Sequence, residues 1–380
     1  MIRLLTSGES HGPAMTVTIE GFPAGVVIDL EKIDHELTRR QRGYGRGKRM
    51  TIEKDSITVV SGIRFGRTLG SPITLVVENK DHQNWQDVMS IHPALENTLV
   101  TAPRPGHADL AGVLKYGFND IRNVLERASA RETVARVAAG GIFKILLSTF
   151  DIRITSQTTA IGGVAAMDRV RSFKEYDVSP LRCADPQAEK TMMEVIDQAC
   201  EQGDSLGGTC EVVACGMIPG LGSYGHFDQR LDARIAGAMM SIPSVKGVGI
   251  GPAFVNAQHT GSCVHDEIVY QAQQGFSRRT NRAGGIEGGV STGENIVVHC
   301  AVKPVPTLGR SLRTVDIKSK EKRSAQKERA DTCVVPAVGV IAESMLAYVL
   351  CSTFIEKFSG DCLVDIRASV TAFQKRIRNV

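Results

Sequence analysis

The stretches RETVARVAAGGIFKILLSTF (Arg131–Phe150) and PAVGVIAESMLAYVLCSTFIEKF (Pro336–Phe358) decide the fold of this chain. In the first stretch, apolar residues recur every three or four positions between Val134 and Leu146, which predicts a long helix with a broad buried face. The second stretch is more apolar, and Pro336 stands in its first turn, where a missing N–H costs little. We therefore expect two long helices in the core.

Shorter patterns around these helices predict an α+β fold that is not a regular βαβ series. Asp29 is placed to cap a helix that ends in a basic loop. Apolar and polar residues alternate in several short runs, as they do in half-buried strands. The predicted strands are Met15–Glu20, Ser56–Val60, Ile73–Val77 and Cys210–Ile218, and the shorter predicted helices are Ala188–Glu201 and Phe227–Met240.

Two segments about two hundred residues apart share a layout. RASARETVARVAAGGI and ERADTCVVPAVGVIA each place an arginine-bearing polar loop before a long apolar helix. An internal pseudo-symmetry is one interpretation, and chance similarity is the other. At 380 residues with 42% hydrophobic residues, the chain can bury the core of one elaborate domain or of two closely packed ones.

Positive charge is local in this sequence. The net charge is only +4, but lysine and arginine cluster at residues 39–54 and again at 310–329, which indicates a local anionic partner. We expect the basic loop Arg39–Arg49 to protrude. An alternative is that this loop contacts nucleic acid and that Tyr44 stacks on a base, but such patches more often bind small anions or lie in solvent.

Cysteine usage and apolar runs set the expected compartment. The nine cysteines form no C-x-x-C pair, which argues against a disulfide framework and against a metal site, so we expect buried, reduced thiols. No signal peptide is recognised at the N-terminus, and no apolar run is expected to span a membrane. We therefore expect a cytoplasmic protein.

Two glycine-bounded turns carry histidines. In GESHG (Gly8–Gly12), His11 can donate a proton near neutral pH and Ser10 can add a hydroxyl hydrogen bond. The alternative is a turn with a satisfied histidine. RPGHAD presents Arg104 and His107 on one irregular segment, while Asp109 is interpreted as a helix cap without further function.

Two later segments suit anionic and planar ligands. RASARET places Arg127, Ser129 and Arg131 at the mouth of a helix, where free N–H groups favour phosphate or carboxylate, although Ser129 could merely cap the helix. The glycine run at residues 282–294 leads to KPVPT (Lys303–Thr307). This arrangement is consistent with a flavin mononucleotide (FMN) lying against the backbone, and a turn-rich surface loop is the alternative.

Together, GESHG, RRQRGYGRG, RPGHAD, RASARET, RAGGIEGG, KPVPT and RADTC resemble the chorismate synthase family in order and spacing along the whole chain. The resemblance implies a 1,4-anti elimination of phosphate from 5-enolpyruvylshikimate 3-phosphate, with reduced FMN as electron donor and no net redox change. It also implies one compact domain over residues 1–380, in which antiparallel sheets enclose long helices, and a homotetramer.

The resemblance also assigns site residues. His11 would lie near the leaving phosphate, His107 near the flavin, and Asp331 beside flavin N5 as a proton relay. The substrate-binding residues would be Ser10, Arg40, Arg46, Arg49, Arg104, Arg131 and Arg329. The flavin contacts would be Arg127, Ala128, Ser129, Pro243, Ser244, Gly288, Lys303, Pro304, Val305, Pro306, Thr307 and Arg329.

Two points qualify this assignment. Arg40 and Arg46 also match positions that bind NADPH in some members, where it serves as reductant, but the substrate carboxylates compete for the same charge. The family usually has Ser or His where this chain has Ala330, so a side-chain hydrogen bond is lost there. A flavin-dependent oxidoreductase acting on a phosphorylated or nicotinamide substrate is the alternative function.

Overall fold

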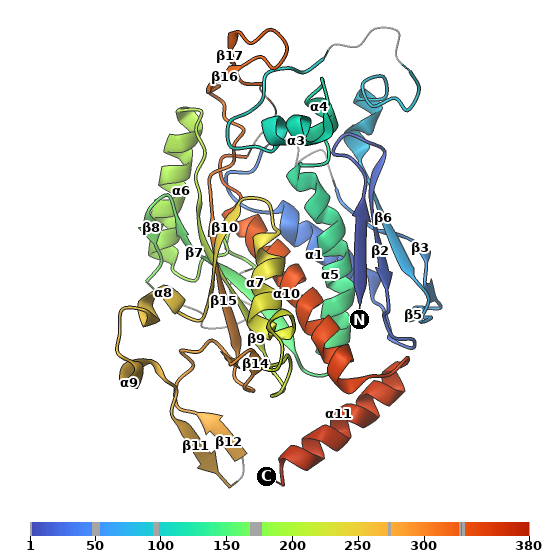
Figure 1. The fold of residues 1–380 in the computed structure, drawn as a ribbon, viewed down its shortest axis with the longest axis vertical. Helices are drawn as coiled ribbons and strands as arrows, with labels where there is room; N and C mark the ends of the chain where they lie inside the picture. Colours follow the sequence, from blue (N-terminus) through green and yellow to red (C-terminus); the bar gives the residue numbers. More distant parts are fainter. Residues whose placement is uncertain are drawn as a thin grey trace.

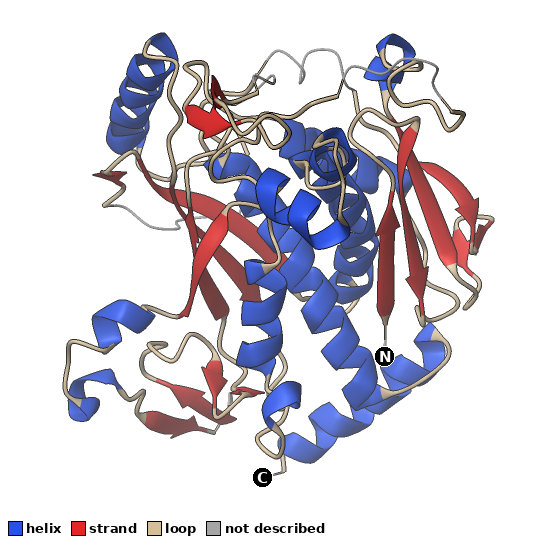
Figure 2. Ribbon diagram, turned by 45° about the horizontal axis from the view of Figure 1, so that its top comes forward, coloured by secondary structure: helices blue, strands red, loops and turns tan. Residues whose placement is uncertain are grey.

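Two antiparallel sheets enclose a layer of helices (Figures 1 and 2). The computed structural model describes residues 2–47, 54–93, 99–167, 177–272, 275–326, 328 and 331–379. One sheet has the order β1-β2-β6-β3, with β1 Arg3–Ser7, β2 Ala14–Glu20, β6 Ile73–Glu78 and β3 Thr58–Ser61. The other has the order β10-β15-β9-β7-β8, with β10 Val245–Ile250, β15 Ile296–Val302, β9 Gly208–Cys215, β7 Arg153–Ile161 and β8 Val164–Ala165.

The helical layer is built on α5 (Thr133–Ser148) and α10 (Val335–Phe358), which pack against each other. The two helices lie close together at Gly140, where an added Cβ would overlap the Ser344 side chain. α1 (Leu30–Gln41) packs on both helices, and α7 (Leu231–Met240) packs on α10. The expected sandwich of antiparallel sheets around long apolar helices is therefore confirmed.

The predicted elements lie close to their expected bounds. The strand patterns at residues 15–20 and 73–77 lie within β2 and β6, and Asp29 caps α1 by accepting a hydrogen bond from Glu31 N–H. α5 follows a short 3-10 turn, Ala130–Glu132, and α10 begins one residue before Pro336. Each long helix also packs on a sheet of its own, α5 on β2 and β6 and α10 on β7 and β9, although the two sheets differ in strand order.

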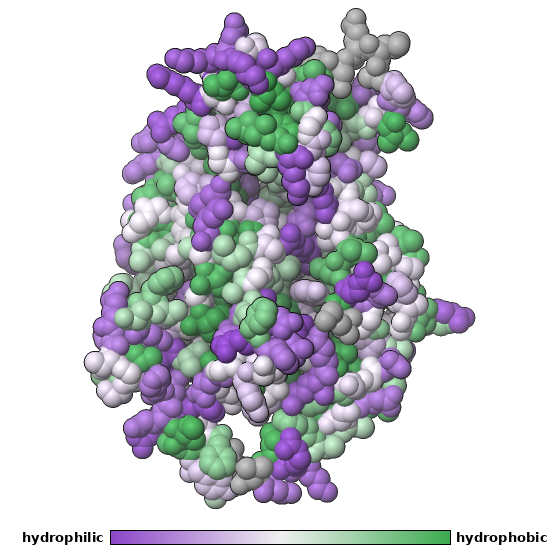
Figure 3. Space-filling view, viewed as in Figure 1, coloured by the Kyte–Doolittle hydropathy of each residue, from purple (hydrophilic) through white to green (hydrophobic). Residues whose placement is uncertain are grey.

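The remaining elements extend from this frame. The helices are α3 Asp109–Tyr116, α4 Arg122–Leu125, α6 Pro186–Glu201, α8 Ala253–Asn256, α9 Gly261–Val264 and α11 Leu363–Ile377, with 3-10 turns η1 Lys80–Asn84 and η3 Phe227–Gln229. The short strand pairs are β4 Ile63–Arg64 with β5 Arg67–Thr68, β11 Ile268–Gln271 with β12 Gly275–Arg278, β13 Ile286–Glu287 with β14 Val290–Ser291, and β16 Arg313–Val315 with β17 Lys322–Ser324. Hydrophilic side chains cover the end of the molecule that carries β16 and β17 (Figure 3).

α10 corrects the expectation that no apolar run could span a membrane. It is the one helix among the described residues that is long and apolar enough to do so, yet 94% of its most apolar window is buried inside the protein. A core helix has the same composition as a spanning one, and here β7, β9, α1, α5 and α7 pack around it.

The basic loop is also placed differently from the expectation. Within Arg39–Arg49, the arginines at 39 and 40 belong to the last turn of α1 and are buried, so this part does not protrude. Charged residues at this position are stable inside the protein because buried carboxylates face them. Two cysteines expected to be buried, Cys200 and Cys263, are instead exposed.

Candidate functional site

A cavity of about 480 Å³ lies at the end of the helical layer where α5 and α10 begin. Its walls come from loops that follow β1, α1, α7 and β15, and from the segments that precede α3, α5 and α10. Loops and helix ends from both halves of the chain therefore meet around one space. Because α5 begins there, its first turn offers the partial positive charge of a helix N-terminus.

Most of the predicted site residues line this cavity. They are Ser10, His11, Arg40, Arg46, Arg104, His107, Ala128, Ser129, Arg131, Pro243, Ser244, Lys303, Val305, Pro306, Thr307 and Asp331. Three others do not line it: Arg127, Gly288 and Pro304. Arg49, Arg329 and Ala330 lie outside the described residues.

The three residues outside the lining have other surroundings. Arg127 donates to the backbone oxygens of Thr6 and Gly8, so its guanidinium holds the turn that carries His11. Gly288 lies in the tight β13–β14 turn with a φ of 59°, and a Cβ added there would meet open space. Pro304 packs toward Gly207.

His11 is held on one ring nitrogen by Glu126. Its Nδ1 lies 3.0 Å from both carboxylate oxygens of Glu126, and its backbone N–H donates to the same carboxylate at 2.8 Å. The ring packs against Trp85 with a centroid separation of 3.9 Å. Burial alone would raise the pKa of Glu126, but hydrogen bonds from His11 and Arg122 hold it below its ordinary value. Glu126 is therefore an ionised partner for His11.

His107 shares its carboxylate with an arginine. Its Nδ1 donates to Asp109 at 2.6 Å, and Arg104 Nε donates to the other oxygen of Asp109 at 2.9 Å. Burial opposes ionisation of Asp109, but these hydrogen bonds keep its pKa well below its ordinary value. The interpretation of Asp109 as a simple cap is wrong. α3 does begin at this residue, but the carboxylate makes no capping bond because it turns back to Arg104 and His107.

Arg40 and Arg131 form a positive wall that is only partly neutralised. Arg131 donates to Asp55 at 2.7 Å, and Arg40 donates to Thr133 Oγ1 and to the Ala130 oxygen. One terminal nitrogen of Arg40 makes no hydrogen bond within the described part of the chain and lies 3.6 Å from Asp55. Burial, together with neighbouring Arg131 and Arg46, lowers the pKa of Arg40 to about 9. The wall therefore favours an anionic ligand.

Asp331 faces the cavity from the start of α10. Its carboxylate accepts a hydrogen bond from Gly47 N–H at 2.6 Å and lies 3.3 Å from a guanidinium nitrogen of Arg46. The backbone after α1 and the segment before α10 are thus joined at the cavity wall. An ionised carboxylate so placed can accept a proton from a ligand.

Another part of the cavity wall combines lysines with apolar side chains. Ser244 has a left-handed backbone, with a φ of 71°, and its oxygen accepts the Lys303 N–H at 2.8 Å. The pKa of Lys303 is lowered by burial and by the nearby charge of Lys246. Apolar cavity residues in this region are Leu125, Ala128, Ile242, Val305 and Pro306. Two lysines beside an apolar wall suit a planar ligand with an anionic group.

Sequence reasoning missed several lining or supporting residues. Glu126 directly precedes RASARET, so its position beside that motif was a usable signal. Asp55, Trp85 and Lys246 carried no pattern that marked them, because their roles depend on contacts with distant segments. Ser129 both caps the turn before α5 and donates to Ser10, so the capping and ligand interpretations are compatible.

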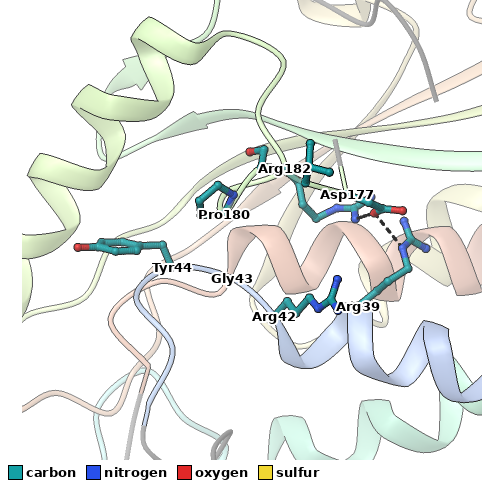
Figure 4. A pocket seen from close by; sticks show the side chains of 9 residues that line it. Arg39, Arg42, Gly43, Tyr44, Asp177, Pro180 and Arg182 are labelled. Carbon is teal, nitrogen blue, oxygen red and sulfur yellow. Dashed lines mark hydrogen bonds and ion pairs between the residues drawn. The ribbon is translucent and has the colours of Figure 1, made fainter. Parts of the chain in front are cut away.

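A second cavity, of about 340 Å³, borders the C-terminal end of α1. It is lined by Arg39, Arg42, Gly43, Tyr44, Asp177, Val178, Ser179, Pro180 and Arg182. In Figure 4, Arg39 and Arg182 both reach Asp177. Each of the two arginines also donates to the buried Glu343 on α10. These cations already have protein carboxylates as partners.

Comparisons with known proteins agree with this geometry. A sequence model of the chorismate synthase family matches residues 2–355. A chorismate synthase of Alkaliphilus metalliredigens is 52% identical over 371 residues, which cover 97% of this chain and 98% of that protein. A chorismate synthase of Geobacillus thermodenitrificans is 50% identical and covers 99% of this chain and all of its own length.

Structural comparison leads to the same family. A crystal structure of a chorismate synthase superposes with a TM-score of 0.82 at 38% identity, covering 100% of this chain and 99% of that one. Sequence and fold agree over nearly the full length, and the chain therefore belongs to the chorismate synthase family.

Proposed function

We propose that the 480 Å³ cavity is where this chorismate synthase chain eliminates phosphate from 5-enolpyruvylshikimate 3-phosphate to give chorismate. The observation that carries this assignment is the wall of Arg40 and Arg131, where one nitrogen of Arg40 has no hydrogen bond to a described residue and positive charges crowd together. The substrate carries two carboxylates and a phosphate, and forked cations are suited to bind such groups. Ser10, Arg46, Arg104 and the two residues outside the described part, Arg49 and Arg329, complete the proposed substrate contacts.

Reduced FMN is proposed to lie against the part of the wall that Lys246 and Lys303 form. Lys246 and Lys303 supply positive charge for its phosphate, and the apolar residues around Val305 suit one face of a planar ring. When bound, this cofactor would supply an electron transiently and recover it, so that no net redox change results. The segments at 128–129, 243–244 and 305–307, with Lys303 and Arg329, are the proposed flavin contacts, and His107 would lie beside the ring.

The acid and base of the elimination are proposed to be His11 and Asp331. The C–O bond to phosphate breaks with its electron pair leaving on oxygen, and His11 donates a proton to that oxygen. A ring C–H bond breaks, its electrons join the new conjugated double bonds, and Asp331 accepts the proton. We expect Asp331→Asn to lower kcat more than it raises KM, because the carboxylate acts in the transition state.

The wider assignment is also our proposal. NADPH is proposed as a source of reducing equivalents for the flavin, with Arg40 and Arg46 as contacts that the substrate also uses. We further propose one domain per chain, a cytoplasmic homotetramer, and no nucleic-acid or membrane partner. Size-exclusion chromatography with light scattering tests the tetramer, and a dimer or monomer at micromolar concentration would contradict it.

A stoichiometric assay tests the reaction itself. The purified chain is given substrate and chemically reduced FMN without oxygen, and phosphate release is compared with reductant consumed. Many turnovers per reduced flavin support the elimination. One reductant consumed per turnover supports the flavin-dependent oxidoreductase instead. A flavin difference spectrum with and without substrate tests the shared cavity, since a ligand stacked near the ring should perturb its absorbance.

A further inference from the structure

Three residues hold His11 in place, and none of them makes a hydrogen bond to the second nitrogen of its ring, Nε2. Glu126 bonds its Nδ1 and its backbone N–H, Trp85 packs on its face, and His82 Nδ1 bonds its backbone oxygen at 2.8 Å. Trp85 is itself held by a hydrogen bond from its Nε1 to Asp81. The Nε2 atom of His11 has no hydrogen-bond partner in the part of the chain that the structure describes, and His11 lines the cavity.

We propose that Glu126 is a positioning residue for the reaction: it orients His11 with Nε2 toward the ligand and stabilises the protonated ring that donates to the leaving phosphate. This inference rests on the acid role proposed for His11. It adds a residue that neither the sequence motifs nor the family comparison assigned.

The argument starts from the hydrogens. An ionised carboxylate only accepts hydrogen bonds, so Nδ1 of His11 must carry a hydrogen to bond Glu126. A proton on Nε2 then makes the ring an imidazolium, whose charge faces Glu126. Once Nε2 has given up its proton, the neutral ring keeps the same bond to Glu126 and the same orientation. Glu126 can therefore hold the protonated and the neutral ring of His11 in the same orientation.

The charged groups near Glu126 determine how strongly its negative charge can stabilise a protonated His11. The charged and titratable groups around this pair are Arg122 on α4, Asp81 and His82 on η1, and Glu328. Arg122 bonds Glu126 at 2.9 Å, but it also lies 5.1 Å from the Trp85 ring and 3.7 Å from Glu328. Among the described residues, Glu126 and Glu328 both face Arg122, so two negative charges meet one guanidinium and a counter-charge remains for the imidazolium.

The pair of His107 and Asp109 has no such excess of negative charge among the described residues. Asp109 is shared with Arg104, which bonds it through two side-chain nitrogens and the backbone N–H. Arg104 also approaches the ring of His107 at 3.1 Å. The guanidinium already neutralises Asp109, so a charged ring at His107 would have no counter-ion of its own. The two histidines are thus prepared for different tasks by the carboxylates behind them.

The test is Glu126→Gln, which keeps the size and one accepting oxygen but removes the charge. We expect kcat to fall about 10- to 100-fold with KM nearly unchanged, since the residue supports a transition-state donor. We also expect the alkaline limb of the kcat profile to move down by about one pH unit, because the imidazolium loses its counter-ion. Glu132→Gln is the matched control, since Glu132 is a buried carboxylate on the same segment that bonds Arg136 and Thr6.

A double-mutant cycle separates positioning from folding. If Glu126 acts through His11, then Glu126→Gln has no further effect in a His11→Ala background. An equal loss of kcat in both backgrounds, or an unshifted pH profile, would overturn the proposal. Full kcat in His11→Ala alone would instead refute the acid role of His11. Nitrogen-15 NMR of labelled histidine gives an independent readout, because Glu126→Gln should weaken the hydrogen bond at His11 Nδ1 and shift the resonance of that nitrogen.

Discussion

Arg39 and Arg40 are neighbours at the end of α1, and both are buried, with 7% and 4% of their surface exposed. Arg39 bonds Glu36, Asp177 and Glu343. Burial opposes its charge, but these carboxylates raise its pKa far above the ordinary value. Arg40 has Asp55 at 3.6 Å and other arginines close by, and its pKa falls to about 9.

The difference distinguishes a structural cation from a ligand-binding one. Arg39 is neutralised by the protein, together with Arg182 and Lys144, around the fully buried Glu343. Arg40 is desolvated without full compensation, so an anion from outside would complete its surroundings. Arg39 and Arg40 are the same residue type and are similarly buried, so the number of carboxylates within reach of each guanidinium decides whether it is structural or binds a ligand.

Replacing Arg39, the structural cation, should have the largest effect, and the effect should be on stability. Arg39→Met leaves Glu343 buried with fewer counter-charges, which we expect to lower the free energy of unfolding by about 3–5 kcal/mol. Urea unfolding followed by circular dichroism measures it. Activity per folded molecule should be retained. A variant that unfolds like the wild type would show that Arg182 and Lys144 suffice for Glu343.

Loss of the ligand-binding cation should affect catalysis more than folding. For Arg40→Ala we expect kcat/KM to fall about 100- to 1,000-fold, which corresponds to roughly 3–4 kcal/mol of binding to the transition state. The urea midpoint should change little or rise, because an uncompensated buried charge is removed. Wild-type kcat/KM in this variant would contradict the proposed substrate role.

Acid pH should weaken the structural cluster. Glu343 has its pKa lowered from 4.5 in the folded protein, since Arg39, Lys144 and Arg182 outweigh its burial. Its contribution to stability is therefore full above pH 4.5 and is lost as the pH falls below that value, where the unfolded chain takes up a proton first. Glu343→Gln should make the unfolding midpoint fall less steeply between pH 5 and 3, roughly the range of carboxylate titration.

The smallest effect is expected from replacing Arg42, one position after the end of α1. Arg42 is exposed and lines the second cavity, where its side chain makes no hydrogen bond or ion pair with another described residue. Arg42→Ala should change the free energy of unfolding by less than about 0.5 kcal/mol and leave kcat/KM unaltered. A marked loss of activity would reveal a ligand role for the second cavity and would blur the distinction between Arg39 and Arg40.

The helices and strands were predictable because their signals are local. The three-and-four spacing in α5 and the alternation in β2 and β6 reflect faces that must be buried. The arrangement of the sheets around the helices followed from the family resemblance and is confirmed by the structural match. Local patterns alone do not show which elements pack together.

The site was predictable where motifs name it and less so where long-range contacts define it. His11, Arg40 and Arg104 stand in recognisable segments, and all three line the cavity. Arg39 looked like part of an exposed loop because its partner Glu343 is 304 positions away in the sequence. Asp109 looked like a cap because a short pattern matched, but tertiary hydrogen bonds determine its orientation.

Gly140 limits which substitutions the cavity can tolerate, although it lies outside the cavity. It lies seven residues after the start of α5, about 10 Å below the cavity at 1.5 Å per residue, where Ser344 of α10 leaves no room for a side chain. Any side chain there would force the two helices apart and would separate Ser129 and Arg131, at the head of one helix, from Asp331, at the head of the other. The spacing of the reacting groups thus depends on a residue that touches none of them.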